Sequence, residues 1–440
     1  MVYKRDMNPL LLPVFAVIIL FNSCTSLQEK QKTDGLPVRS TKTEIPQKAD
    51  SSPASHENLL REKGSEIIQG ITPMAADIEL MDRREKIGQL FMVEVRDPRN
   101  GKLLTKIDDS FREWAADLQP GGYILFADNL VNPEQTMKLI TDLKALTTVP
   151  PFVALDEEGG VVSRLNAVPG MKGVPVPAAR VIGSSGHVTQ AQWAGRTIAR
   201  QLKDLGFSVN FAPVADIHIP GSGGAIGERS YGTEPQIVSE MAVAFSRALE
   251  AEGILSVAKH FPGHGAAYGD SHTEKTVLDA SLNLLIQREL VPFTSLIGQG
   301  IGGIMTGHII VPSLDSTEKP ASLSMNINDT LLRNYMNYKG LIFTDSLRMG
   351  GVTAFYNTAE LPLLAFEAGA DILLMPVSPT ESRQILLKAL ESGRIPEQRL
   401  DDSLKRIAAA KQKFLARKNK TPAPYELLPL LPLESSCPWR

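Results

Sequence analysis

Short apolar runs alternate with longer amphipathic stretches between about residues 72 and 417. The runs are rich in β-branched or aromatic side chains and are bounded by glycine or proline, which is typical of buried parallel strands. They are QLFMVEV (89–95), GGYILFA (121–127), PFVALD (151–156), FSVNFAPV (207–214), ILSVAKH (254–260), GGIMTGHI (302–309), GLIFTD (340–345) and ADILLMP (370–376).

The stretches between these runs carry the period of amphipathic helices. Examples are PEQTMKLITDLKAL (133–146) and EPQIVSEMAVAFSRALEAEG (234–253), where Gly253 suits the end of a helix. Eight strands alternating with helices predict a single α/β domain, a (β/α)8 TIM-type barrel, over residues 72–417. An open, doubly wound sheet is the alternative architecture.

The barrel hypothesis predicts where chemistry takes place, because active sites of this fold lie at the C-terminal ends of the strands. Polar residues gather at those ends, namely Asp156, Asp216, Lys259, His260, His308 and Asp345. Any one of them could cap a strand, but together they predict a site at the mouth of the barrel.

The first 24 residues resemble a bacterial lipoprotein signal peptide. Lys4 and Arg5 precede an apolar run at 10–21 that is too short to span a bilayer, and small Ser23 stands before Cys24. We therefore expect Cys24 to carry lipid and the protein to be exported and membrane-anchored. An ordinary signal peptide or an uncleaved anchor is the alternative.

Two further segments flank the barrel in the sequence. Residues 25–71 are largely polar and predict a flexible tether, and residues 418–440 form a tail rich in proline and leucine. Lys and Arg number 46 against 49 Asp and Glu, a net charge of -3. No nucleic-acid partner is expected from this balance, and we expect a monomer without a cofactor.

The segment KHFPGHGAAYGDSH (259–272) concentrates candidate chemistry. His260 and His264 have the spacing of a helical metal pair, but Pro262 lies between them, so we expect no metal site. Asp270 could orient His272 for proton transfer near neutral pH. A surface histidine beside a loop-capping aspartate is the simpler alternative.

Two other segments add carboxylates. In FTDSLRMGG (343–351), Asp345 would end a strand at the barrel mouth, where it could act as a nucleophile or cap the next helix. In ALDEEGGVVSRL (154–165), acidic residues and Arg164 surround a glycine pair. Such charged groups suit the recognition of sugar hydroxyls, although a tight turn with a surface ion pair would look the same.

Taken together, these motifs resemble the bacterial β-N-acetylhexosaminidases of glycoside hydrolase family 3, the NagZ group. The most specific of them is KHFPGHG followed by DSH. The other matching segments occur along the chain in the family's order; they are PGGYILFADNL, LDEEGGVVSRL, NFAPVADI, GERSYG and GLIFTDSLRMGGV. The similarity runs from about residue 77 to 380.

The resemblance implies a retaining exo-hydrolase that removes terminal β-linked N-acetylglucosamine, with peptidoglycan fragments as the expected glycan substrate. By the resemblance, Asp345 is the nucleophile and His272 the acid/base, paired with Asp270. It further implies that the N-acetylglucosamine ring is held by Asp156, Arg164, Arg229, Lys259 and His260. A histidine acid/base departs from the common pair of carboxylates.

Departures from the family pattern leave alternatives open. DEEGG stands where DQEGG is common, and we expect Glu157 to add charge near the rim. A neutral histidine does not repel an anionic acceptor, so a phosphorylase is one alternative. A glycan-binding lipoprotein without turnover is another, and β-glucosidase-like specificity is a third.

Overall fold

The computed structural model describes residues 73–222, 226–269 and 275–416. The predicted signal peptide, the tether and the tail lie outside these residues, as do Cys24, Asp270 and His272. No helix in the described part combines the length and apolar character needed to cross a membrane.

Eight parallel strands form one sheet in the order β11-β9-β7-β6-β3-β2-β1-β12. Each of the eight predicted runs matches one of them, although β7 extends one residue beyond its run. The strands are β1 (Phe91–Glu94), β2 (Gly122–Ile124), β3 (Phe152–Leu155), β6 (Val209–Asn210), β7 (Leu255–Phe261), β9 (Gly303–Thr306), β11 (Leu341–Thr344) and β12 (Leu373–Leu374). A parallel bridge between Phe343 and Ile372 joins the two ends of this order. The sheet thus closes, which confirms the barrel and excludes the open sheet.

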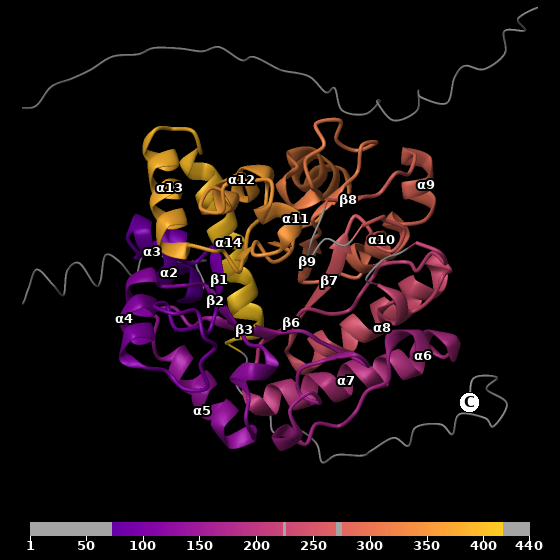
Figure 1. Ribbon diagram of the computed structural model, residues 1–440, viewed down its shortest axis with the longest axis horizontal. Helices are drawn as coiled ribbons and strands as arrows, with labels where there is room; N and C mark the ends of the chain where they lie inside the picture. Colours follow the sequence, from indigo (N-terminus) through magenta and orange to yellow (C-terminus); the bar gives the residue numbers. More distant parts are fainter. Residues whose placement is uncertain (1–72, 223–225, 270–274, 417–440) are drawn as a thin grey trace, which may run out of the picture. The chain divides into compact units, whose positions relative to one another are not determined.

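Helices surround the strands (Figure 1). They are α2 (Pro73–Glu79), α3 (Arg83–Gly88), α4 (Asp109–Leu118), α5 (Pro133–Lys144), α6 (Ala179–Ser184), α7 (Val188–Leu205), α8 (Pro235–Glu252), α9 (Leu282–Gln287), α10 (Leu290–Gly298), α11 (Gly350–Thr353), α12 (Leu361–Ala368), α13 (Pro379–Glu391) and α14 (Glu397–Phe414), with a π-helix, η5 (Asn326–Tyr335). The predicted helix at 234–253 is α8, and Gly253 ends it with a φ of 96°. Apolar side chains such as Ile198, Phe245 and Phe343 are fully buried between the layers.

The barrel carries two additional two-stranded sheets, which the apolar runs do not predict. β4 (Glu157–Gly159) pairs antiparallel with β5 (Val162–Ser163), directly after β3. β8 (Thr276–Val277) pairs parallel with β10 (Ile309–Ile310). The first of these shapes the site described below.

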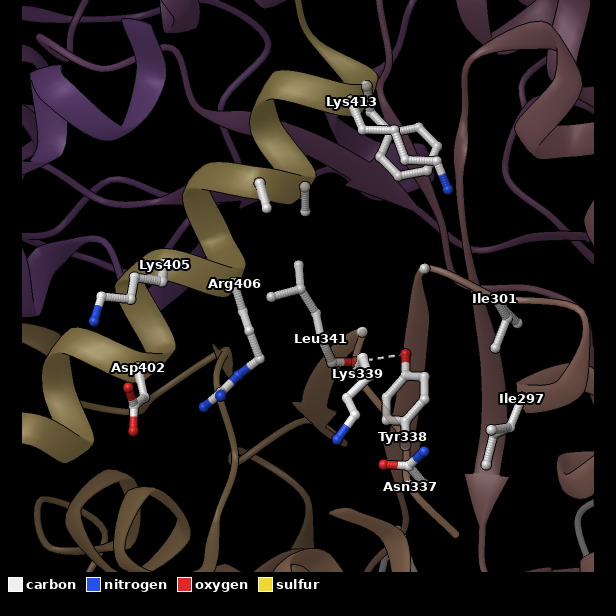
Figure 2. A pocket seen from close by; sticks show the side chains of 16 residues that line it. Ile297, Ile301, Asn337, Tyr338, Lys339, Leu341, Asp402, Lys405, Arg406 and Lys413 are labelled. Atoms are coloured by element: carbon white, nitrogen blue, oxygen red, sulfur yellow. Dashed lines mark hydrogen bonds between the residues drawn. The ribbon is translucent and has the colours of Figure 1, made fainter. Parts of the chain in front are cut away.

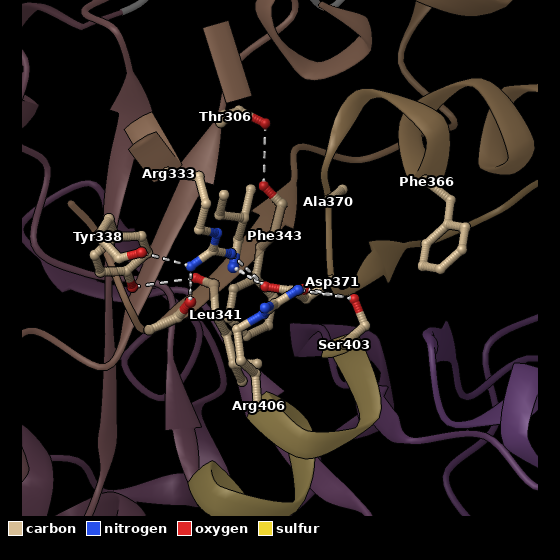
Figure 3. Close-up of polar contacts among 12 residues, drawn as sticks. Thr306, Arg333, Tyr338, Leu341, Phe343, Phe366, Ala370, Asp371, Ser403 and Arg406 are labelled. Carbon is tan, nitrogen blue, oxygen red and sulfur yellow. Dashed lines mark hydrogen bonds and ion pairs between the residues drawn. The ribbon is translucent and has the colours of Figure 1, made fainter. Parts of the chain in front are cut away.

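A buried ion cluster stabilises the seam of the barrel, the place where β11 meets β12 and the sheet closes (Figure 3). Asp371 is fully buried and accepts from the Ile342 backbone amide at 3.0 Å, Arg333 at 2.7 Å and Arg406 at 2.9 Å. Burial would raise the pKa of Asp371, but the surrounding arginines hold it below its usual value. An ionised carboxylate therefore ties three separate elements together at the closure point.

A pocket of about 540 Å³ lies near this seam, at the end of the barrel where β9 and β11 begin (Figure 2). Its wall includes Tyr338, whose hydroxyl donates to the Leu341 carbonyl at 3.2 Å, and Phe414 of α14. This is the face opposite the C-terminal ends of the strands, where residues of this fold mainly serve stability.

Candidate active site

A cavity of about 360 Å³ opens at the C-terminal ends of the strands. It brings together all of the predicted site residues that the structure describes, namely Asp156, Arg164, Arg229, Lys259, His260 and Asp345. They come from segments far apart in the sequence, so the closed barrel is what assembles them.

Asp345 follows the last residue of β11, where its backbone amide donates to the Thr306 carbonyl at 2.9 Å. It does not cap the next helix. One carboxylate oxygen accepts from the Ser346 amide at 2.7 Å, and the side chain lines the cavity. Burial opposes its ionisation, yet His260 and His308 bring the pKa of Asp345 below the usual value. The cavity thus holds an ionised carboxylate suited to nucleophilic attack.

Two cations and two carboxylates form the opposite wall. Lys259 Nζ lies 2.6 Å from Asp156 and 2.8 Å from Glu158, and Arg229 binds both oxygens of Glu158 at 2.8 and 2.9 Å. Burial raises the pKa of Glu158 less than Lys259 and Arg229 lower it, so it falls to about 2. Charged donors and acceptors held in fixed positions can form hydrogen bonds with several hydroxyls of one sugar ring.

The β4–β5 hairpin places these carboxylates, because its glycine pair makes the turn. Gly159 and Gly160 have φ values of 87° and 57°, and a Cβ at Gly160 would lie 2.6 Å from the Ala178 Cα. The expectation that Glu157 adds charge at the rim is wrong. Its side chain points into the hairpin, where it accepts from the Leu165 amide at 3.0 Å, and burial raises its pKa.

Histidines and a buried aspartate form the third part of the site. Asp216, with no exposed surface, binds His260 Nδ1 at 2.7 Å and the His264 amide at 2.6 Å. The two imidazole rings lie edge to face with centroids 5.7 Å apart. Among the described residues no group of three potential ligands could hold a metal ion. Asp216 fixes the ring orientation and leaves His260 Nε2 for other contacts.

Sequence reasoning did not assign several cavity residues. Glu158 lines the cavity, and Asp216, which was expected at the barrel mouth, contacts His260 instead. Nothing in the sequence pattern showed that these two carboxylates anchor the cations and the histidine. Apolar side chains complete the lining, among them Phe126, Phe211 and Met305. The Arg164 guanidinium lies 5.7 Å from the Phe126 ring centroid and 3.6 Å from Asp156. Such contacts are set by tertiary structure and leave no spacing signal in the chain.

The predicted acid/base residues lie outside the residues that the structure describes. Asp270 and His272 fall in the segment 270–274 that the structure leaves out. That segment directly follows the described Gly269 in the chain, and Lys259, His260 and His264, which precede it, line the cavity.

Comparisons with known proteins identify relatives of this chain. Residues 83–410 match the glycosyl hydrolase family 3 N-terminal domain. β-Hexosaminidase A of Pseudoalteromonas piscicida is 33% identical over 340 residues, 71% of this chain and 56% of that protein. The β-hexosaminidase LpqI of Mycobacterium tuberculosis is 34% identical over 76% of this chain and 83% of its own length. A solved family 3 β-N-acetylglucosaminidase from a Paenibacillus strain superposes with a TM-score of 0.72 at 33% identity, covering 78% of this chain and 64% of that one.

Proposed function

The chain belongs to glycosyl hydrolase family 3 and is a glycosidase of the β-hexosaminidase type, and we propose that Asp345 is the nucleophile with which it removes terminal β-linked N-acetylglucosamine. The family expected from KHFPGHG and its companion motifs is thereby confirmed. One observation carries the residue assignment: an ionised carboxylate, Asp345, lines a cavity whose opposite wall presents paired charges for sugar hydroxyls.

The proposed reaction has two steps with retention of configuration. Asp345 attacks the anomeric carbon as the glycosidic bond breaks, and protonated His272 gives its proton to the departing oxygen. Neutral His272, oriented by Asp270, then takes a proton from water, whose oxygen displaces Asp345 and releases the sugar. The first step leaves His272 neutral, as the second step requires, and the second step restores protonated His272 and the unbound Asp345 carboxylate.

The remaining polar groups would bind the sugar. Glu158 holds Lys259 and Arg229 in place at the wall of the cavity, where their cationic groups can bond sugar hydroxyls. Asp156, Arg164 and His260 complete the ring of donors and acceptors. Phe126 and its apolar neighbours suit the methyl group of an N-acetyl substituent.

We propose peptidoglycan-derived fragments as the natural substrate and the outside of a membrane as the location. The support is the signal-like segment ending at Cys24 together with the hexosaminidase relatives. The protein would act as a monomer tethered by lipid on Cys24. Replacing Cys24→Ala in cells should move it from the membrane fraction to the soluble fraction; unchanged membrane association would contradict the anchor.

The experiment that tests the activity uses p-nitrophenyl β-N-acetylglucosaminide. Wild type should release nitrophenol and β-configured sugar, and Asp345→Asn should lose at least about 10³-fold in kcat. Asp315→Asn is the control, because Asp315 is a buried aspartate that does not line the cavity. Full activity in Asp345→Asn would refute the assignment. Turnover that requires phosphate and yields a sugar phosphate would instead favour the phosphorylase.

A further inference from the structure

A second cavity, of about 560 Å³, lies beside the first at the same end of the barrel. The two share walls formed by neighbouring residues. After β12, Met375 lines the first and Pro376 the second; after β11, Met349 lines the first and Arg348 the second. Glu94, at the end of β1, lines the second. A molecule leaving the catalytic cavity over this wall would therefore enter the second one directly.

An indole and a fixed set of charged groups give the second cavity its character. Trp114 of α4 is half-buried, and its Nε1 donates to Thr380 Oγ1 at 3.2 Å, which holds the ring at the edge of the cavity. The indole face is apolar and electron-rich, so it packs well against the C–H groups on one face of a pyranose ring.

Glu94 organises the polar side of the same cavity. Its buried carboxylate binds the Arg96 guanidinium and also accepts from Arg348 Nε at 3.2 Å. Arg96 is further fixed by the Gly101 carbonyl, whereas the Arg348 side chain keeps 37% of its surface exposed. Arg348 thus has donors left for a ligand while its position is set by Glu94. Three acidic residues, Glu94, Asp97 and Glu381, line the cavity with the two arginines, so donors and acceptors for hydroxyls are both present.

We infer that this second cavity is a saccharide subsite for the sugar units beyond the one that is hydrolysed, with Trp114 as the stacking platform and Arg348 as a hydroxyl donor. The inference rests on the proposed glycosidase activity at Asp345. It predicts that an oligosaccharide gains from contacts that a glycoside with a small leaving group cannot reach.

The test compares two substrates of the full chain. The β-1,4-linked N-acetylglucosamine trimer can reach the second cavity, and methyl β-N-acetylglucosaminide cannot; free N-acetylglucosamine is measured for both. Trp114→Ala and Arg348→Ala should each lower the ratio of kcat/KM for the trimer over that for the methyl glycoside by about tenfold. Trp114→Phe should restore most of the ratio. Arg112→Ala, an exposed change on the same helix, is the control and should leave it unchanged.

The possible failures are distinguishable. If wild type hydrolyses neither substrate, the proposed activity fails and the subsite with it. If wild type hydrolyses both and neither Trp114→Ala nor Arg348→Ala changes the ratio, the activity stands and the subsite is refuted. Arg348→Ala keeps the test decisive if Trp114→Ala does not fold, because the exposed Arg348 side chain contributes little to the core.

Discussion

Glu158 is the residue on which the cationic wall of the cavity depends. It bonds Lys259 and Arg229 at the same time, and each of these cations is largely buried. Removing one member of a buried ion cluster leaves uncompensated charge, which typically costs about 3–5 kcal/mol. We predict that Glu158→Gln lowers the free energy of unfolding by about this amount and weakens sugar binding, as measured by urea denaturation and KM.

The charge of Glu158 should make the free energy of unfolding depend on pH. The pKa of Glu158 is about 2 in the folded protein, below its ordinary value of 4.5, so the folded state binds fewer protons than the unfolded state. Its contribution is therefore complete above about pH 4.5 and is lost as the pH falls toward 2. The stability difference between wild type and Glu158→Gln should shrink over that interval. A difference that stays constant from pH 6 to 3 would contradict the role of the charge.

At the scale of elements, the β4–β5 hairpin is shaped by Gly160. A methyl group there would meet Ala178 at 2.6 Å, and the positive φ disfavours any other residue. We predict that Gly160→Ala destabilises the protein by about 1–3 kcal/mol and lowers kcat/KM by displacing Glu158 and Arg164. Thermal melts and turnover of the aryl glycoside measure both effects.

Gly186→Ala is the matched control for this change. Gly186 has a similar φ of 67°, but nothing lies within 4 Å of a Cβ built there. It should show the conformational penalty alone, about 1 kcal/mol, with no change in kcat/KM. Equal loss of activity in both variants would mean that the hairpin's close approach to Ala178 is unimportant.

The seam at Asp371 is the element contact that closes the barrel. Three arginines and two further donors converge on this one carboxylate, so Asp371→Asn should lower the free energy of unfolding by about 3–5 kcal/mol. The exposed pair of Arg394 and Glu367 provides the comparison, and Glu367→Gln should change it by less than about 1 kcal/mol. Similar values for the two variants in urea denaturation would contradict a special role for the seam.

At the scale of the whole molecule, the apolar runs predicted all eight strands because each is buried on both faces and leaves a continuous hydrophobic signal. The β4–β5 hairpin was missed because EEG and VS carry no such signal. The barrel fold, once predicted, was enough to place Asp345 and Lys259 together at the C-terminal ends of the strands. Contacts such as that between Glu158 and Arg229 did not, since they join segments 71 positions apart through geometry that only the closed barrel fixes.

Lys411 is buried on the strand-start side of the barrel and links α14 to Gln89, the residue at the C-terminal end of α3 just before β1. Its Nζ donates to Gln89 Oε1 at 2.7 Å, and burial lowers its pKa to about 7 from an ordinary 10.5. The unfolded state therefore binds more protons between pH 7 and 10.5, and stability should rise with pH across that window. Below pH 7 the buried charge opposes folding in full.

Replacing Lys411→Met removes that charge and keeps most of the volume. At pH 6 we expect the free energy of unfolding to rise by about 2–4 kcal/mol, because relief of the charge outweighs the lost hydrogen bond to Gln89. Near pH 10 most of the gain should be lost, since the amine is then neutral in the folded state and begins to lose its proton in the unfolded state. Urea denaturation at pH 6, 8 and 10 measures this trend, with exposed Lys405→Met on the same helix as the control. A gain that is independent of pH would show that Lys411 acts through packing rather than through its charge.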